Sequence, residues 1–462
     1  MTLSDADNGR LADHPSVAQY SRHVNPAFVK LLGVYGYGRL FTRARDVWVW
    51  DSEERQYLDL LAGFGAVNLG HNPPRLIARM QRFLAEDAFN LNHIGPAPQA
   101  AALAAKLAEL TAPLTVSLFS SSGGEAVEAG LKLARAATRR KGFLYCDGGF
   151  HGTNLGTLSV MGSTRLRKPF EPLLADCTAV RFGDRGALRA ELTKRTYAAF
   201  LIEPIQGEGG VVLPHRDYLA EAQQWCKQYG TLLVLDEVQT GLGRTGTMFA
   251  YQTESFVPDI LVLGKALGGS LVPISATLTT PELHRRAYGS MSRFDLHSST
   301  FAGNALACTA ALETLAILEQ DHLLENCKAR GDELLVKLRN RLQGHPLVRE
   351  VRGRGLLIGI DLGPSGDGWL SQVAPWIGEP IARGILGQWL AVRLLEAGII
   401  AQPASQAWNV LRLEPPLTIQ AEPIDRVVDV IGSILDEYRS LRKLFTDVTD
   451  RLGRQFLAGW KF

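Results

Sequence analysis

Three short segments in the middle of the chain are almost continuously apolar. They cover residues 199–202 (AFLI), 232–235 (LLVL) and 260–263 (ILVL). Such runs are typical of parallel strands that are covered on both faces of a sheet. A helix-type pattern at 217–229 lies between the first two runs, and the alternation of strand, helix and strand predicts a doubly wound α/β sheet. Ligands of such a sheet gather at the carboxyl ends of its strands.

Different patterns flank this central region. Residues 47–51 and 57–59 predict two small strands joined by a polar turn. From about residue 321 onward, long amphipathic helix patterns are interrupted by glycine and proline positions. We therefore expect three parts, which are an N-terminal lobe at 1–80, a large domain at 81–320 and a C-terminal domain at 321–462.

Composition and charge exclude several other classes of protein. The 49 lysine and arginine residues nearly balance 47 acidic residues, and the formal charge of +2 offers no strong field for nucleic acid or acidic membranes. The five cysteines are scattered and lack a C-x-x-C pair, which favours reduced thiols in the cytoplasm over a disulfide framework or a metal site. No leader pattern and no run of about 18 apolar residues occurs, so export and membrane spanning are not expected.

Two opposite charges follow two of the apolar runs. The run at 232–235 is followed by Asp236, and the run at 260–263 leads to Lys265. Burying an unpaired carboxylate is costly, so Asp236 should face a cation, and a protonated pyridine nitrogen would serve. A lysine at the end of a buried strand can lose its proton through desolvation and become the amine needed for a Schiff base. The alternatives are a helix cap or surface ion pair for Asp236 and a solvated side chain for Lys265.

A serine- and glycine-rich segment precedes another predicted helix. Ser122, Gly123 and Gly124 stand directly before a pattern whose apolar stripe includes Val127 and Leu131. Free backbone amides and the positive end of a helix dipole favour an anion, and glycine lets the backbone approach it closely, so the segment is a candidate phosphate site. Serine is also a preferred N-cap, and an ordinary cap is the alternative. The two charged strand ends favour the phosphate site.

Four further segments carry candidate chemistry, each with a structural alternative. A glycine-flanked loop could present a ring to a flat heteroaromatic group, a strand end adds acids to the same rim, a segment before a helix could bind an anion, and a lone arginine could hold a carboxylate. The alternatives are core packing, surface solvation, helix capping and a structural salt bridge, respectively. The residues concerned are Phe150 and His151, Glu203 with Gln206 and Glu208, Ser299 and Thr300, and Arg412.

Together these segments resemble the class III aminotransferases, which are pyridoxal 5'-phosphate (PLP) enzymes of fold type I. The resemblance runs from about residue 51 to about residue 417, through the blocks SSGGEAVEAGLKLAR, GGFHG, IEPIQGEGG, LDEVQTGLGRTG, LGKALGGS and HSSTFAGNALAC. Within the family, RKPFEPLL, EVQTGLGRTG and RLEPPLTI look most like the putrescine and diamine branch. The resemblance implies a PLP-binding large α/β domain, a mainly parallel sheet with helices on both faces, and a smaller α+β domain built from both chain ends.

The resemblance also implies how this chain would hold PLP. Lys265 matches the Schiff-base lysine and Asp236 the partner of the pyridine nitrogen. Val238 would pack against the ring, with Phe150 stacked on its other face. The remaining cofactor contacts that the resemblance implies are Gln239 on the phenolic oxygen, His151 in the loop of Phe150, and Ser122, Gly123 and Gly124 on the phosphate.

Other matched positions concern the substrate and a second subunit. Thr300, next to Ser299, would reach the phosphate from a neighbouring subunit, so a homodimer with shared active sites is implied. Glu203 resembles an acid near the ring and the substrate. Glu208 and Arg412 resemble a gate that opens when a dicarboxylate substrate needs the arginine.

The chain departs from the family pattern in three places. Where relatives carry an N-S-G-T block, this chain has Ser121 and Gly124, so phosphate binding would rely more on the backbone. Residues 362–386 form an apparent insertion that contains Trp369 and Trp376, and 445–462 extend beyond the shared core. The insertion bears on the choice of substrate.

The resemblance implies ping-pong transamination, in which Lys265 is displaced by an amine and then moves the proton of the carbon that bears the nitrogen. The expected substrates are a terminal, diamine-like amine or its aldehyde and a keto acid such as 2-oxoglutarate or pyruvate. A longer acyl or polyketide-derived aldehyde is the first alternative, because the insertion is apolar. A PLP-dependent mutase or decarboxylase is the second, since fold and cofactor do not determine the reaction. A scaffold that retains the pocket without activity is the third.

Overall fold

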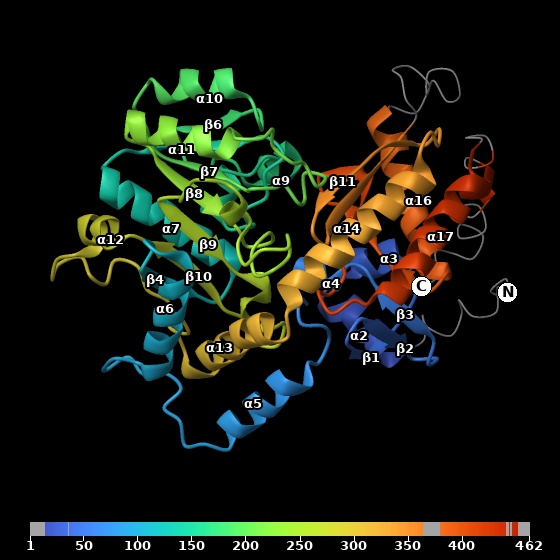
Figure 1. Cartoon of the computed structure of the whole chain (residues 1–462), viewed down its shortest axis with the longest axis horizontal. Coiled ribbons are helices and arrows are strands. Elements are labelled where there is room, and N and C mark those ends of the chain that lie inside the picture. The colour runs from blue at the N-terminus through green and yellow to red at the C-terminus, as the bar shows by residue number, and fades with distance from the viewer. Residues whose placement is uncertain (1–13, 36, 364–378, 440–442, 444–445, 451–462) are drawn as a thin grey trace.

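The computed structural model describes residues 14–35, 37–363, 379–439, 443 and 446–450. Two lobes lie side by side in Figure 1, and the long helices drawn in orange and gold run between and along them. Within the apparent insertion, Trp369 and Trp376 lie outside the described residues, as does most of the segment 445–462.

A seven-stranded sheet forms the centre of the lobe at the left of Figure 1. Neighbouring strands are parallel from β9 to β6, whereas β10 is antiparallel to both β4 and β9. The three apolar runs form β7, β8 and β9, which confirms the predicted sheet. The strand order is β4 (Val116–Ser120), β10 (Ser275–Thr279), β9 (Ile260–Leu263), β8 (Leu232–Asp236), β7 (Tyr197–Ile202), β5 (Gly142–Cys146) and β6 (Cys177–Val180).

Helices cover both faces of this sheet, because its central strands are apolar on both sides. On one face α7 (Gly123–Thr138) packs its apolar stripe against alternate residues of the strands, including Val234 and Val262. The opposite face packs Leu233 and Leu235 against α11 (Tyr218–Tyr229), the helix predicted at 217–229. The other helical elements of this lobe are α5 (Pro74–Leu84), α6 (Pro98–Thr111), α8 (Leu155–Ser159), α9 (Thr164–Arg167), η1 (Lys168–Phe170), α10 (Arg185–Leu192), η2 (Ala250–Thr253), η3 (Lys265–Gly268), α12 (Pro281–Tyr288) and α13 (Ala305–Gln320).

Two four-stranded sheets form the second lobe. The first has the order β1 (Phe41–Arg45), β2 (Trp48–Asp51), β3 (Gln56–Asp59) and β13 (Ile399–Ile400). Its last strand pairs in parallel with β3, so segments from both ends of the chain share one sheet, which confirms the predicted α+β character. The second sheet has the order β11 (Val348–Arg354), β12 (Leu357–Leu362), β15 (Ala407–Leu413) and β14 (Gln402–Ala404). The helices of this lobe are α2 (Pro15–His23), α3 (Pro26–Tyr35), α4 (Ala62–Gly65), α14 (Leu323–Leu342), α16 (Glu379–Glu396) and α17 (Ala421–Glu437).

The predicted boundary near residue 321 falls between α13 and α14. The division into three parts stays a prediction. None of the described helices has the length and apolar character needed to cross a bilayer. Across the described ranges, no three His, Cys, Asp or Glu side chains are grouped so that they could hold a metal ion. All five cysteines are free, and only Cys177 is partly exposed.

Candidate active site

Polar residues meet where the parallel strands β7, β8 and β9 end. Asp236 is the last residue of β8 and pairs with Val262 of β9, three residues before Lys265. Glu203 follows Ile202, the last residue of β7, which pairs with Leu235 of β8. Because parallel strands end at the same edge of a sheet, these three predicted side chains come from adjacent positions.

Asp236 is buried and bonded on both carboxylate oxygens. Its Oδ2 lies 2.8 Å from Nδ1 of His151, and its Oδ1 accepts a hydrogen bond from the Val238 backbone at 3.0 Å. His151 is 3% exposed, and its Nε2 has no hydrogen-bond partner in the described part of the chain. A buried ring nitrogen without a partner is uncommon in folded proteins, so it marks a place where a polar group is expected.

Glu203 is tied to the loop that carries the predicted ring. Its Oε2 accepts a hydrogen bond from the Phe150 backbone at 3.0 Å. Burial raises the pKa of Glu203 to about 7, although His151 opposes the rise, and the Asp236 carboxylate adds to it. This carboxyl group therefore titrates near neutral pH, which suits a residue that exchanges a proton.

Lys265 follows β9 at the start of η3, in a left-handed backbone conformation with a φ of 44°. Non-glycine residues rarely adopt such a φ, and strained backbone of this kind clusters at functional sites. Burial lowers the pKa of the Lys265 amine, while the carboxylates of Glu414 and Glu208 oppose this shift. A neutral amine is thus more accessible here than on a solvated lysine.

The predicted phosphate segment begins α7, with Ser122 as its N-cap. The Ser122 hydroxyl accepts a hydrogen bond from the Glu125 backbone at 3.2 Å, so the capping alternative holds for this side chain. The next two amides, of Gly123 and Gly124, point out of the first helical turn with no intrahelical acceptor. A Cβ on Gly123 would lie 2.9 Å from Val238 Cγ1, so only glycine fits between the helix start and that side chain.

Gln239 lies between the two lobes. It is 7% exposed, and its Nε2 donates hydrogen bonds to the Phe64 carbonyl at 3.2 Å and to Glu414 Oε2 at 2.9 Å. Its Oε1 packs against Gly207, where a Cβ would lie 1.7 Å from that oxygen. The amide orientation follows from these contacts, because a flipped amide would face two acceptors with its own oxygen.

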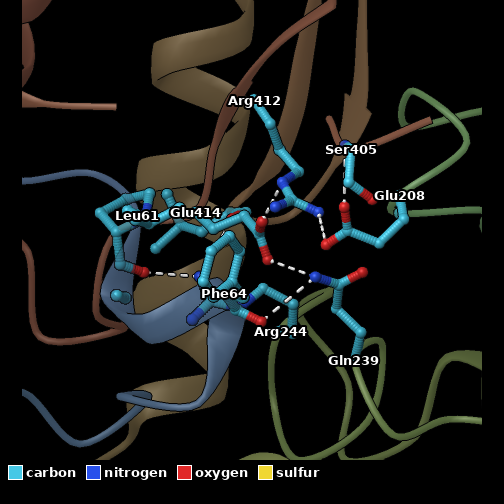
Figure 2. Close-up of polar contacts among 12 residues, drawn as sticks. Leu61, Phe64, Glu208, Gln239, Arg244, Ser405, Arg412 and Glu414 are labelled. Atoms are coloured by element: carbon cyan, nitrogen blue, oxygen red, sulfur yellow. Dashed lines mark hydrogen bonds and ion pairs between the residues drawn. The ribbon is translucent and has the colours of Figure 1, made fainter. Parts of the chain in front are cut away.

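Glu208 and Arg412 form the predicted ion pair, with Arg412 Nη1 lying 2.5 Å from Glu208 Oε1 (Figure 2). Burial alone would raise the pKa of Glu208, but the Arg412 guanidinium, helped by Lys265, holds it at about 2. The Phe64 ring lies 5.7 Å from the guanidinium carbon of Arg412. The pair joins the large lobe to β15.

Sequence reasoning missed Glu414, which is fully buried and pairs with Arg412 Nε. Residues two apart on an extended segment point to the same side, so an acid two positions after Arg412 was the available signal. It also missed Arg244, whose Nη1 and Nη2 bond the Leu356 carbonyl at 3.0 Å and Asn68 Oδ1 at 2.6 Å. Arg244 is fully buried, and these contacts join the large lobe to the second lobe.

Ser299 and Thr300 are not brought to the other predicted residues. Thr300 is exposed and Ser299 is partly exposed. Their capping alternative is wrong, because α13 begins later, and Asn304 is its N-cap with a side chain that accepts from the Ala307 backbone at 2.9 Å. The contact of Thr300, next to Ser299, with the phosphate bound by a neighbouring subunit stays a prediction.

The residues at the strand ends fit the chemical groups of PLP. A buried carboxylate at Asp236 suits a protonated ring nitrogen, and two helix-start amides, the first of them on a glycine with no room for a side chain, suit a phosphate. The deprotonated form of the Lys265 amine suits attachment to an aldehyde carbon. The ring nitrogen, the phosphate and the aldehyde of the cofactor thus each have a partner of matching chemistry near the carboxyl edge of the sheet.

Comparison with known proteins agrees with this fit. The family model for class-III aminotransferases matches residues 36–435. Aminotransferase PigE from Serratia sp. (strain ATCC 39006) is 36% identical in a match 460 residues long that covers 92% of this chain and 54% of that protein, so the chain spans about half the length of this relative. The ornithine aminotransferase of Toxoplasma gondii has a TM-score of 0.80 and 28% identity, covering 95% of this chain and 100% of that one.

A second solved structure carries the cofactor itself. An amine transaminase from an uncultivated Pseudomonas species, solved in its PLP-bound form, has a TM-score of 0.77 and 30% identity over 86% of this chain and 95% of that one. These matches confirm the predicted fold type I architecture and PLP as the cofactor of the family. The chain belongs to the class III aminotransferase family.

Proposed function

We propose that this chain moves an amino group between a terminal, diamine-like amine or its aldehyde and a keto acid such as 2-oxoglutarate or pyruvate, by a ping-pong mechanism. One observation carries the proposal. A lysine amine whose pKa is lowered by burial and a buried, histidine-bonded carboxylate follow adjacent parallel strands, at Lys265 and Asp236. Membership of the aminotransferase family supports the reaction type.

Each residue would act through its own contacts. PLP, when bound, supplies a ring that accepts electrons from the carbon losing its proton. Lys265 would attach the cofactor and, once displaced by the amine substrate, carry that proton. Asp236 would hold the ring nitrogen in its protonated form, and His151 would keep the carboxylate in place through the 2.8 Å contact. The other proposed cofactor contacts are Ser122, Gly123, Gly124, Phe150, Glu203, Val238, Gln239, Ser299 and Thr300.

We also propose that two copies of the chain pair around these sites. Exposed large apolar side chains cluster on the segments before α6 and before α13. These segments touch, because the Asn90 backbone oxygen accepts a hydrogen bond from the Ala305 backbone at 3.0 Å. A second copy would cover this surface and place its Thr300 near the partner's phosphate site. The apolar residues concerned are Leu84, Phe89, Ile94, Met291, Phe294 and Phe301.

Pairing is tested by measuring mass in solution by light scattering. We expect a dimer for the unchanged chain and a shift to monomer for the double variant Met291→Asp, Phe301→Asp. Val336→Asp is the matched control, since Val336 is also an exposed apolar residue but lies on α14. A monomeric unchanged chain would rule out shared sites.

The buried free cysteines favour a cytoplasmic location, which we include in the proposal.

The reaction is tested by spectrally monitored half-reactions. The PLP-loaded protein is mixed with a panel of amines of increasing length, including diamines, and the carbonyl product is identified. We expect the absorbance of the bound cofactor to change with terminal amines, to recover with a keto acid, and to show neither response in Lys265→Ala. Full turnover by Lys265→Ala would contradict the assignment. Release of carbon dioxide, or isomerisation without a keto acid, would favour a decarboxylase or mutase instead.

A further inference from the structure

The loop that follows Phe150 runs directly against the start of α7. At Gly152, whose φ is 107°, a Cβ would lie 2.9 Å from the Gly124 Cα, so the two backbones approach closely because neither residue has a side chain. One turn further along α7, the Glu128 carboxylate accepts a hydrogen bond from the Thr157 backbone at 2.9 Å. The loop is therefore held against the helix at two points.

The side chain of Asn154 lies in the space that a side chain at position 124 would fill. A Cβ on Gly124 would meet Asn154 Oδ1 at 3.4 Å and Nδ2 at 3.5 Å. Asn154 is the N-cap residue of α8, but its side chain makes no capping hydrogen bond there. Its backbone oxygen is fixed, because it accepts hydrogen bonds from the Leu158 backbone at 2.7 Å and from Thr157 Oγ1 at 3.0 Å. An exposed carboxamide is thus placed beside the helix start.

The start of α7 uses part of its hydrogen-bonding capacity for its own cap. The backbone amides of Ser121 and Ser122 donate to Glu125 Oε2 at 2.7 and 3.2 Å. The amides of Gly123 and Gly124 remain, together with the proton of the Ser122 hydroxyl. A phosphate monoester has a charge of about −1.5 to −2 at neutral pH and three strongly accepting oxygens, so it can take more donors than these. A carboxamide offers two further N–H groups without adding a charge.

We propose that the Asn154 carboxamide donates a hydrogen bond to the phosphate of PLP, from the space that the missing side chain at Gly124 leaves open. The N-S-G-T pattern of relatives has a threonine at this position of the helix, whereas this chain brings the donor from a separate loop. The inference rests on the proposed function, since it requires that the start of α7 holds the cofactor phosphate. The alternative is an ordinary solvated asparagine.

The test compares PLP with pyridoxal, which has the same ring and aldehyde but no phosphate. Each compound is titrated into the apoprotein, and the apparent Kd is read from the absorbance of the bound compound. In Asn154→Ala we expect the Kd for PLP to rise about tenfold, because a hydrogen bond to a charged group is lost, and the Kd for pyridoxal to stay unchanged. Asn154→Asp should weaken PLP by about a hundredfold, because a carboxylate would then face the phosphate.

A double variant tests whether positions 124 and 154 serve the same place. In Asn154→Ala, Gly124→Thr, the hydroxyl on α7 should restore the Kd for PLP to within about threefold of the unchanged chain. Threonine has room there, because the three atoms nearest to a Cβ on Gly124 all belong to the Asn154 carboxamide, which alanine lacks. Asn340→Ala is the matched control, since Asn340 is an exposed asparagine on α14, and it should change neither Kd.

Three results would refute the contact. They are equal PLP affinity in Asn154→Ala and the unchanged chain, equal weakening of PLP and pyridoxal, and no recovery in the double variant. Equal weakening of both compounds would mean that the loop is altered and that no phosphate contact was lost. These results leave the proposed function standing. If the unchanged chain forms no complex with PLP, the proposed function itself fails, and the phosphate contact fails with it.

Discussion

His151 Nδ1 lies 2.8 Å from Asp236 Oδ2, and both side chains are buried at the carboxyl edge of the central sheet. The two residues are 85 positions apart, Asp236 at the end of β8 and His151 in the loop after β5, and they meet because β5 and β8 end at the same edge. The contact leaves one histidine nitrogen bare and keeps the carboxylate in one orientation. It links the loop of Phe150 to the strand ends.

Replacing His151 should weaken cofactor binding through Asp236. In His151→Phe we expect the apparent Kd for PLP to rise about tenfold to a hundredfold, because a hydrogen bond to a charged group is lost. The measurement is a titration of the apoprotein followed by cofactor absorbance. His345→Phe is the control, since His345 is also buried but lies in the second lobe. An unchanged Kd in His151→Phe would show that Asp236 needs no orienting partner.

Glu203 should make stability depend on pH near neutrality. Burial raises its pKa from 4.5 to about 7, so the folded chain binds this proton more tightly than the unfolded chain. The resulting stabilisation is fully present below pH 4.5 and is lost as the pH rises through about 7. Urea unfolding from about pH 5 to about pH 8 should therefore give a free energy of unfolding that falls with pH.

In Glu203→Gln this fall should be shallower, because the titrating group is gone. Part of the slope should remain, since burial also raises the pKa of Glu237 to about 7. Arg165→Gln, which changes the charge of a surface residue, serves as a control that keeps the slope. An identical slope in Glu203→Gln and the unchanged chain would mean that the acid stays ionised throughout this pH range.

Gly123→Ala should damage the phosphate site by steric overlap. The added Cβ would lie 2.9 Å from Val238 Cγ1, so the helix start or Val238 must move. We expect the apparent Kd for PLP to rise about tenfold or more. Gly186→Ala places a methyl group near the start of α10, where the nearest atom is 3.5 Å away, and should leave the Kd unchanged. Equal affinity in both variants would remove Gly123 from the cofactor site.

Asp59 should control the turn that carries Phe64. Residues 62–65 all have positive φ, from 46° to 76°, and Asp59 Oδ1 accepts hydrogen bonds from Leu61 and Ala62 at 2.8 and 2.9 Å. A left-handed turn of this kind is costly unless its neighbours hold it. Asp59→Ala should lower the free energy of unfolding by about 2 kcal/mol and raise the KM for amines severalfold.

Asp51→Ala separates the two effects of this change. Asp51 is equally buried and holds a neighbouring turn through the Glu53 and Arg55 backbones, both at 3.0 Å, but it does not contact the turn of Phe64. It should lower stability without changing the KM. If both variants raise the KM, the cause is a general loss of stability in the second lobe and not the turn of Phe64. Thermal unfolding and initial-rate kinetics provide the two measurements.

Local patterns were sufficient for the elements and residues whose role depends on their immediate neighbours. The runs that became β7, β8 and β9 are apolar throughout because both faces of the sheet are covered. Asp236 and Lys265 stood out because a charge directly after such a run needs a reason. The alternative that Ser299 or Thr300 caps α13 was wrong. Ser299, Thr300 and Asn304 all have side chains that can cap a helix, and only the path of the chain selects Asn304.

The sequence by itself determined that a doubly wound sheet brings an acid and a lysine to one edge, because strand order and strand direction follow from local pattern and short connections. Only the tertiary structure decided what surrounds them. Glu414 meets Gln239 across 175 residues, and Arg412 meets Glu208 across 204. Contacts over such separations arise when the two lobes pack together, and no local periodicity records which polar side chains will then share one buried space.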